Sequence, residues 1–218
     1  MKPSIVAKVG GSLFDLPDLR ERLLAWVKQK GDRPILFVPG GGEAANVIRK
    51  LDEIHQLGEE KSHWLAIRMM SGNAHFLAEL LGLTVVSSLS LRFAEGAEGR
   101  GQTLADCERQ PLPPGPLLRN GEGGERQISV LDPLPFCETD PLLEQSWRVT
   151  SDSIAARVAI AIEADLDLLK SVDLPPGTSW QHASKAGLLD EFFPSLVENS
   201  GLEVTWVNLR ASDATPRQ

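Results

Sequence analysis

The sequence Ala7-Lys8-Val9-Gly10-Gly11-Ser12-Leu13 joins a short apolar run, residues 4–9, to a segment with helical periodicity. A strand that ends in two glycines presents backbone N–H groups at its carboxyl end, and glycine lets an anion approach that backbone closely. Lys8 adds a positive charge beside the turn. These features predict a phosphate-binding turn, although a turn between a strand and a helix that binds nothing could carry the same glycines.

The segments after this turn alternate between helical and strand patterns. Apolar residues with helical spacing occupy residues 16–27, and the apolar run 34–38 ends in a second turn, Pro39-Gly40-Gly41-Gly42, before a helical stripe at residues 44–54. Right-handed crossovers place both glycine turns at one edge of a parallel sheet. Because ligands bind at that carboxyl edge, the pair of turns favours a ligand site.

The whole pattern predicts a three-layer α/β/α sandwich with a largely parallel central sheet, in a single domain over residues 1–218. Further helices are expected at residues 59–81, after 151–153 and at 188–199, and further strands at 84–88, 127–131, 147–150, 166–172 and 204–208. Residues 94–124, rich in glycine, proline and charge, predict a loop or flap with a short helix near 103–109, and residues 213–218 a frayed tail.

Composition excludes several classes of protein. The net charge of −8 argues against nucleic-acid binding, which needs a basic surface. Because the N-terminus lacks an apolar signal region and no run approaches the roughly 18 apolar residues of a membrane span, we expect a cytoplasmic protein without a membrane partner. Cys107 and Cys137 have no C-x-x-C spacing and the four histidines no ligand spacing, so no protein-bound metal is expected.

The second glycine turn also matches the dinucleotide fingerprint G-x-G-x-x-A at Gly40, Gly42 and Ala45. The acidic residue that the fingerprint requires about twenty residues later would be Glu59 or Glu60. These residues start a predicted helix rather than end a second strand, and the fingerprint does not explain Lys8. A dinucleotide site therefore remains an alternative to a phosphate site.

Two further motifs lie at predicted strand ends. Ser151-Asp152-Ser153 precedes an alanine-rich helical stripe, where it either caps the helix or directs Asp152 toward the glycine turns to orient a lysine. Lys170 ends an apolar strand, where it either extends to solvent or binds a phosphate. Two lysines and an aspartate suit phosphoryl transfer, which depends on positioning and charge neutralisation. Arg49, on the helix after the second glycine turn, could reach an anionic substrate.

In this order and at this spacing, the motifs resemble those of the amino acid kinase superfamily. The matching segments are Lys8–Ser12, Val38–Gly42, Val149–Ala156 and Leu168–Asp173. The resemblance implies the α/β/α fold, ATP as phosphoryl donor with Mg²⁺, a small-molecule substrate and commonly a homodimer. It also implies that Lys8 binds the transferred phosphoryl group and that Asp152 holds the catalytic lysine in place.

The remaining site predictions follow from the same motifs. We expect the nucleotide at Gly10, Gly11, Ser12, Gly41, Lys170 and Asp173. The resemblance implies that the amides of Gly10, Gly11 and Gly41 hold the donor phosphates or the developing negative charge. We expect the acceptor at Gly40, Gly42, Arg49 and Ser151.

Within the superfamily, the chain is most similar to short stand-alone members, among them kinases of aminomethyl-furan-methyl phosphate in methanofuran assembly. Residues 47–52 followed by 62–67 prompt this comparison. The chain departs from its relatives at Lys170, where many have threonine, and at residues 172–177, where a hairpin that covers the adenine is shortened. We therefore expect an ATP-dependent kinase acting on a carboxylate or phosphate oxygen, with a non-catalytic nucleotide- or oxyanion-binding protein and a dinucleotide-dependent enzyme as alternatives.

Overall fold

The centre of the computed structural model, which describes residues 4–89, 127–198 and 200–211, is a six-stranded sheet. Its strands lie in the order β3-β4-β2-β1-β5-β6, and each neighbouring pair is parallel. The strands are β1 (Ile5–Val9), β2 (Ile35–Pro39), β3 (Val85–Val86), β4 (Ile128–Leu131), β5 (Asp165–Lys170) and β6 (Val204–Asn208). The predicted fold class, a parallel sheet between helical layers, is confirmed.

Helices cover both faces of the sheet because side chains alternate along each strand. The helices are η1 (Gly11–Leu13), α1 (Leu19–Gln29), α2 (Gly42–His55), α3 (Glu59–Leu81), α4 (Pro133–Thr139), α5 (Ser151–Ala161), α6 (Trp180–Lys185) and α7 (Phe193–Val197). In β1, Ile5, Ala7 and Val9 pack with α1 and the C-terminal half of α3. Val6 points the other way, toward α5 and α7. In the described segments, no helix is long and apolar enough to cross a membrane.

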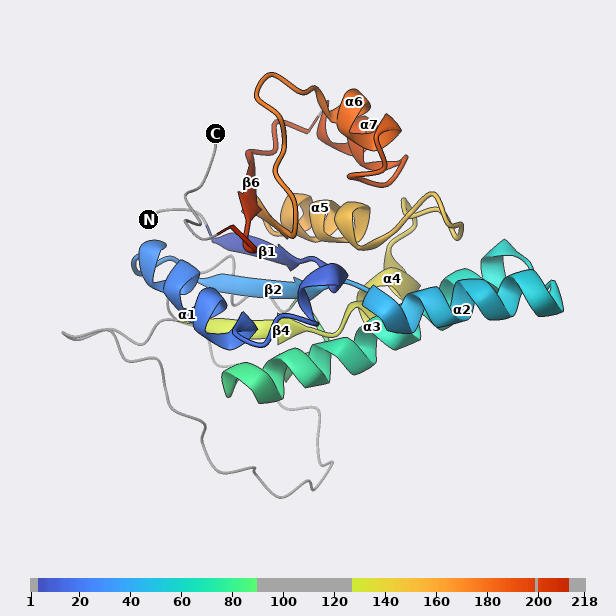
Figure 1. The fold of residues 1–218 in the computed structure, drawn as a ribbon, viewed down its shortest axis with the longest axis horizontal. Helices are drawn as coiled ribbons and strands as arrows, with labels where there is room; N and C mark the ends of the chain where they lie inside the picture. Colours follow the sequence, from blue (N-terminus) through green and yellow to red (C-terminus); the bar gives the residue numbers. More distant parts are fainter. Residues whose placement is uncertain (1–3, 90–126, 199, 212–218) are drawn as a thin grey trace.

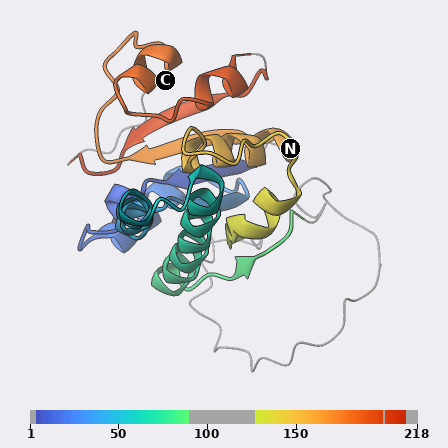
Figure 2. The same ribbon diagram turned by 90° about the vertical axis from the view of Figure 1, so that its right-hand side faces the viewer.

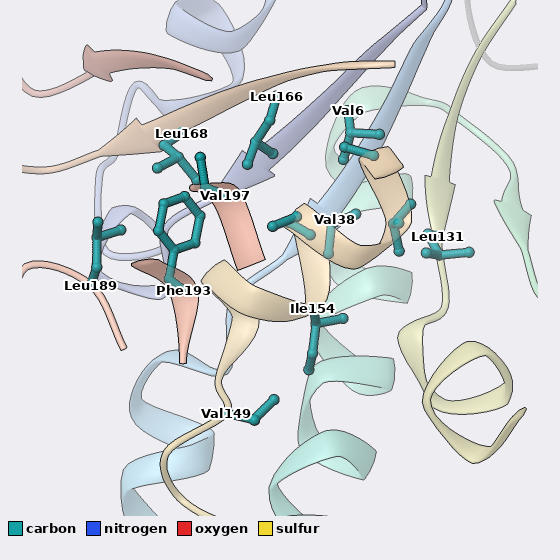
Figure 3. Packing of buried hydrophobic residues seen from close by; sticks show 14 of the residues in the cluster. Val6, Val38, Leu131, Val149, Ile154, Leu166, Leu168, Leu189, Phe193 and Val197 are labelled. Atoms are coloured by element: carbon teal, nitrogen blue, oxygen red, sulfur yellow. The ribbon is translucent and has the colours of Figure 1, made fainter. Parts of the chain in front are cut away.

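The core between the sheet and α5 fixes the start of α5 near the carboxyl ends of the strands. Val6 and Leu168 of the sheet, Ile154 of α5, and Phe193 and Val197 of α7 belong to one buried cluster (Figure 3). Phe193 is fully buried, and truncating such a residue typically costs about 3–5 kcal/mol. The first turn of α5 is therefore held rigidly beside β1 and β5.

Helices α2 and α3 lie side by side, and α2 extends beyond the ends of the strands (Figures 1 and 2). The apolar stripe predicted at residues 44–54 is mostly exposed. Ala45 and Ile48 are buried, but Val47 is 47% exposed, Leu51 39% and Ile54 70%. Most of this stripe does not pack into the core, because α2 projects past the ends of the strands and, within the described residues, packs mainly against α3 and η1.

Several predicted elements differ from the structure. Residues 147–150 form a loop rather than a strand, because Val149 packs into the core while the Thr150 N–H donates to Asp190. The predicted helix 188–199 is reduced to α7, and α4 and α6 have no counterpart in the prediction. The strand predicted at 84–88 contracts to Val85–Val86, and that at 166–172 ends at Lys170. The predicted flap at 94–124 and tail at 213–218 lie outside the described residues.

Candidate active site

A cleft of about 980 Å³ opens at the carboxyl edge of the sheet. Its lining comes from both glycine turns, the ends of β1 and β5, the first turn of α5, and parts of α2, α3 and residues 184–191. The predicted site residues in this lining are Lys8, Gly11, Ser12, Gly41, Gly42, Arg49, Ser151, Asp152 and Lys170. Gly10, Gly40 and Asp173 are not part of it, and Asp173 is exposed after the end of β5.

Asp152 holds two lysines in this cleft. Its Oδ1 lies 2.8 Å from Lys8 Nζ, and its Oδ2 lies 2.8 Å from Lys170 Nζ. All three side chains are buried, with residue exposures of 9% or less. The sheet register explains the arrangement: Lys8 pairs with Leu168, so Lys8 and Lys170 project from neighbouring strands onto the face that α5 covers. The helix start brings Asp152 between them.

The opposite charges in this cluster offset the unfavourable effect of burial on each charged group. Burial raises the pKa of Asp152, but the charges and hydrogen bonds of Lys170 and Lys8 outweigh it and lower this pKa to about 2. Burial lowers the pKa of Lys170 to about 8, against the attraction of Asp152 and together with the repulsion of Lys8. Asp152 is therefore a permanent anion near neutral pH. Lys170 titrates much closer to neutrality than an ordinary lysine.

Lys170 has two further neighbours that the sequence did not indicate. Its Nζ donates to the carbonyl oxygen of Leu188 at 2.8 Å and lies 5.2 Å from the centroid of the Trp206 ring. Trp206 comes from β6 and Leu188 from the segment after α6. Both neighbours favour the ammonium form of Lys170 and hold it beside Asp152.

The two glycine turns pack directly against each other. A Cβ atom on Gly11 would lie 2.2 Å from the backbone nitrogen of Gly42 and 2.4 Å from its Cα. Gly42 has a φ of +57°, which favours glycine. The closeness of the turns thus explains Gly11 and Gly42 without a ligand, and it also brings the amides of both turns to one place.

Replacing Gly11 with alanine is expected to push the two turns apart, because the new methyl group would overlap backbone atoms that have no flexible way to yield. We expect a loss of about 2 kcal/mol or more of unfolding free energy in urea, together with weaker ATP binding. Gly72→Ala is the matched control. Gly72 lies inside α3 with open space around it, so alanine should raise the stability by about 0.5–1 kcal/mol. Equal stability of G11A and the wild type would contradict the argument.

The backbone amides of the turns divide into two kinds. The N–H of Gly10 donates to Leu169 O and that of Gly40 to Val9 O, each at 2.8 Å. The expectation that the Gly10 amide holds a phosphate is therefore wrong, because this amide is already used to join β1 to β5. Within the described part of the chain, the N–H groups of Gly11 and Gly41 donate to no protein acceptor. These two amides remain available to an anion in the cleft.

Side chains from distant parts of the chain fix the turns. Asn73 of α3 donates to the carbonyl oxygens of Gly40 at 2.7 Å and Gly41 at 2.9 Å. The hydroxyl groups of Ser12 and Ser171 lie 2.8 Å apart, and Arg210 donates to Ser12 O at 2.8 Å. Sequence reasoning did not identify Asn73, Ser171 or Arg210. The available signal for Asn73 was its place in α3 directly before the buried Ala74.

A second part of the lining comes from α2, α3 and the loop before α5. The Arg49 guanidinium group lies 4.6 Å from the centroid of the Trp147 ring and donates to Asn46 at 3.1 Å. Ser151 is buried at the start of α5. Burial lowers the pKa of His63, against a hydrogen bond with the Ser146 backbone, so this cleft histidine is neutral near pH 7. Arg49 thus supplies an exposed positive charge to this part of the cleft.

The start of α5 is capped differently from the prediction. Thr150 is the N-cap residue, and Ser151, Asp152 and Ser153 lie within the first helical turn. The carboxylate of Asp190 is the acceptor at the start of this helix: it accepts hydrogen bonds from Thr150 N at 2.9 Å and Ser153 N at 3.0 Å. Of the two alternatives for residues 151–153, the helix cap is wrong because the distant Asp190 performs the capping. This leaves Asp152 free to bind the lysines. The other alternative, Asp152 directed toward a lysine, agrees with its contacts to Lys8 and Lys170.

The residues of a dinucleotide site or a metal site are not found together in the described part of the cleft. Glu59 and Glu60, the acidic candidates of the dinucleotide fingerprint, open α3 and do not line the cleft. Among residues 4–89, 127–198 and 200–211, no three histidine, cysteine, aspartate or glutamate side chains group as a metal site. Lys8, Asp152 and Lys170 with the two glycine turns are therefore the chemically distinctive part of the cleft.

Comparison with known proteins agrees with this geometry. The model of the amino acid kinase family matches residues 3–173. The [5-(aminomethyl)furan-3-yl]methyl phosphate kinase of Methanocaldococcus jannaschii is 28% identical over 219 residues, which cover 94% of this chain and 88% of the relative. The acetylglutamate kinase of Pasteurella multocida is 27% identical over 190 residues, covering 79% of this chain and 71% of the relative.

The fold has known counterparts as well. The crystal structure of UMP kinase from Ureaplasma parvum superposes with a TM-score of 0.58 at 13% identity, covering 98% of this chain and 92% of that one. At this identity the likeness concerns the fold alone. The family match, however, spans the first glycine turn, the second glycine turn and Asp152. The family resemblance predicted from the motifs is thereby confirmed: this chain belongs to the amino acid kinase family.

Proposed function

We propose that this phosphotransferase transfers the γ-phosphoryl group of ATP to a carboxylate or phosphate oxygen of a small metabolite. The observation that carries the proposal is Asp152, which contacts Lys8 and Lys170 with its two carboxylate oxygens. In the same cleft, no acceptor among the described residues takes the Gly11 and Gly41 amides. Phosphoryl transfer develops negative charge on the moving group and on the leaving ADP oxygen. Two buried ammonium groups and two free amides would stabilise that charge.

The chemistry needs no general base from the protein. A carboxylate or phosphate acceptor is already ionised near neutral pH, so its oxygen attacks the γ-phosphorus while the bond to the bridging β,γ-oxygen breaks and ADP leaves. Asp152 is unsuited to proton transfer because its pKa is about 2 and both of its oxygens are held. Its proposed role is to orient the lysines. Lys8 would bind the transferred group, and Lys170 the nucleotide phosphates.

Magnesium would reach the cleft bound to ATP. Mg²⁺ prefers oxygen ligands and commonly binds through substrate phosphates and water. The Asp152 oxygens are occupied by lysines, and the described residues offer no cluster of three or more candidate ligand side chains. When bound, the ion would neutralise phosphate charge beside the lysines. We expect this reaction in the cytoplasm, the compartment where ATP is abundant; cell fractionation checks this.

The acceptor is proposed to be an anion that contacts Arg49 and Ser151. Arg49 lines the cleft, and the Trp147 ring supports its guanidinium group. The Methanocaldococcus relative is named for an acceptor that itself carries a phosphate. A furan-methyl phosphate is therefore the first acceptor to test, and acetylglutamate represents the carboxylate class.

The direct test incubates the purified protein with Mg-ATP and one acceptor at a time: the aminomethyl-furan-methyl phosphate, acetylglutamate or UMP. We expect one acceptor to raise ADP release at least about 100-fold over ATP alone, with the phosphorylated product seen by ³¹P NMR. ATP binding by calorimetry without transfer to any acceptor would favour the non-catalytic alternative. Binding of NAD without binding of ATP would favour the dinucleotide alternative.

The Lys170 pKa predicts how activity depends on pH. Only the ammonium form of Lys170 carries the charge that attracts phosphates, and its pKa in the free protein is about 8. We therefore expect kcat/KM for ATP to be constant near pH 7 and to fall about tenfold per pH unit above about pH 8, since kcat/KM reports the free enzyme. A profile that stays flat to pH 10 would show that Lys170 is not needed in its charged form.

We also propose that the exposed apolar face of α2, formed by Val47, Leu51 and Ile54, is covered by a second copy of the chain. Ile54 alone is 70% exposed, and three adjacent apolar side chains on one helix are typical of an interface. Ile54→Glu is expected to convert a dimer into a monomer in sedimentation analysis. Val172→Glu, at an equally apolar exposed position after β5, is the control and should leave the mass unchanged. A monomeric wild type would refute the dimer.

A further inference from the structure

Residues 188–193 contribute a contact to the cluster of Lys8, Asp152 and Lys170, although they lie beyond the residues that the family model matches. The amino acid kinase model ends at residue 173, yet the Leu188 carbonyl oxygen accepts a hydrogen bond from Lys170 Nζ. Residues 188–192 of this segment, between α6 and α7, form no helix or strand. Backbone hydrogen bonds hold its two ends, since the Leu188 N–H donates to Ala183 O at 2.9 Å and the Phe192 N–H to Arg148 O at 3.2 Å. The residues between these two points need a further connection to α5.

Asp190 provides that connection. Its Oδ2 accepts from the Thr150 N–H and hydroxyl, both at 2.9 Å, and from the Ser153 N–H at 3.0 Å. Its Oδ1 accepts from the Ser153 hydroxyl and from the Phe193 N–H at 2.9 Å. The residue is 9% exposed and thus holds five donors from two elements in a buried place. Thr150 and Ser153 lie on either side of Asp152 in the chain.

We propose that Asp190 is a positioning residue of the phosphoryl-transfer site, tying residues 188–193 to the first turn of α5 so that the Leu188 carbonyl meets Lys170 while Asp152 stays between the two lysines. The inference rests on the proposed function, because it assigns Lys170 to phosphoryl transfer. Asp190 lies in the lining of the cleft, but among the described residues no hydrogen bond or ion pair joins it to Lys8 or Lys170. It acts through the backbone that it holds and through its charge. Burial and the neighbouring Asp152 raise the pKa of Asp190, and the hydrogen bonds donated by Ser153 and Thr150 oppose that rise.

The charge of Asp190 is one of several that set the pKa of Lys170. Lys170 faces Asp152 from α5, Lys8 from β1, the Trp206 ring from β6 and Asp190 from the loop before α7. Asp152 and Asp190 favour the ammonium form, and Lys8 disfavours it. The neighbouring Glu191 pairs with Arg148. Removing the Asp190 charge therefore lowers the pKa of Lys170, which a merely structural carboxylate remote from the site would not do.

The test measures the pKa of Lys170 in the protein without ATP, by ¹³C NMR of labelled lysine side chains, with Lys170→Arg to assign the signal. In Asp190→Asn we expect this pKa to fall by about half a unit or more. The alkaline limb of kcat/KM for ATP should move by the same amount. Asp140→Asn is the matched control, because the Asp140 side chain is also buried and pairs with Arg157 in the middle of α5, outside the cleft. It should lower the melting temperature and leave the Lys170 pKa unchanged.

A folded Asp190→Asn protein with the wild-type Lys170 pKa would overturn the inference. If this variant does not fold, Asp190→Glu decides. Asp190→Glu keeps the charge but displaces the Leu188 carbonyl by a methylene length. The pKa of Lys170 should therefore still fall, but by less than in Asp190→Asn. An unchanged pKa would overturn the inference. Because the titration needs no turnover, it remains decisive even if no acceptor is phosphorylated, an outcome that would instead count against the proposed function.

Discussion

Replacing Lys8 with methionine is expected to lower kcat about 10³-fold or more while the protein stays folded. Lys8 is buried in the cleft beside Gly11, and its ammonium group is placed to meet the transferred phosphoryl group. Charged groups of this kind are typically worth about 10³-fold in phosphoryl transfer. Methionine fills most of the lysine volume, and Lys170 still pairs with Asp152, so the core remains packed. Single-turnover transfer from ATP measures the chemical step directly.

Lys30→Met is the control for this substitution. Lys30 is a half-buried lysine paired with the buried Asp167, since its Nζ lies 2.5 Å from Asp167 Oδ2, but it follows α1 and does not line the cleft. Lys30→Met should lower the melting temperature and leave kcat within about twofold of the wild type. A Lys8→Met protein that turns over ATP as fast as Lys30→Met would refute the assigned role of Lys8.

Asp152→Asn is expected to damage both stability and activity. The asparagine amide can accept from one lysine only, and its NH₂ group would face the other ammonium group. Leaving a buried charge without its partner typically costs about 3–5 kcal/mol, measured here by urea unfolding at pH 7. Without the Asp152 charge the pKa of Lys170 falls further below about 8, so part of Lys170 is neutral at pH 7. We expect kcat to fall about 10²-fold or more.

The pH dependence of stability separates this role from a simple packing role. The folded pKa of Asp152 is about 2, below the unfolded value of about 3.9, so its stabilisation is complete above about pH 4 and is lost as pH falls through 2. The difference in unfolding free energy between wild type and Asp152→Asn should shrink over that range. Asp140→Asn, which breaks another ion pair of α5, should lose stability but keep kcat. Equal losses of kcat in both variants would contradict the role of Asp152.

The sequence by itself determined the alternation of strands and helices, the parallel sheet and the family. These follow from local patterns: the period of apolar residues, the apolar runs of buried strands and the glycines at strand ends. It also indicated Lys8, Asp152 and Lys170, because a charged residue at the end of an apolar strand or at a helix start is visible without coordinates. The pattern failed at residues 147–150, where one buried valine and a distant carboxylate decide the conformation.

The tertiary structure alone decided how these residues combine. Lys8 and Lys170 meet because β1 and β5 are neighbours in a register that places both side chains on the face covered by α5. The cap of α5 comes from Asp190, and the Gly10 amide, expected to bind phosphate, is used to join two strands. The physical reason is that a buried charge or backbone amide must find a partner, and the nearest partner is set by which strands and helices pack together rather than by sequence distance.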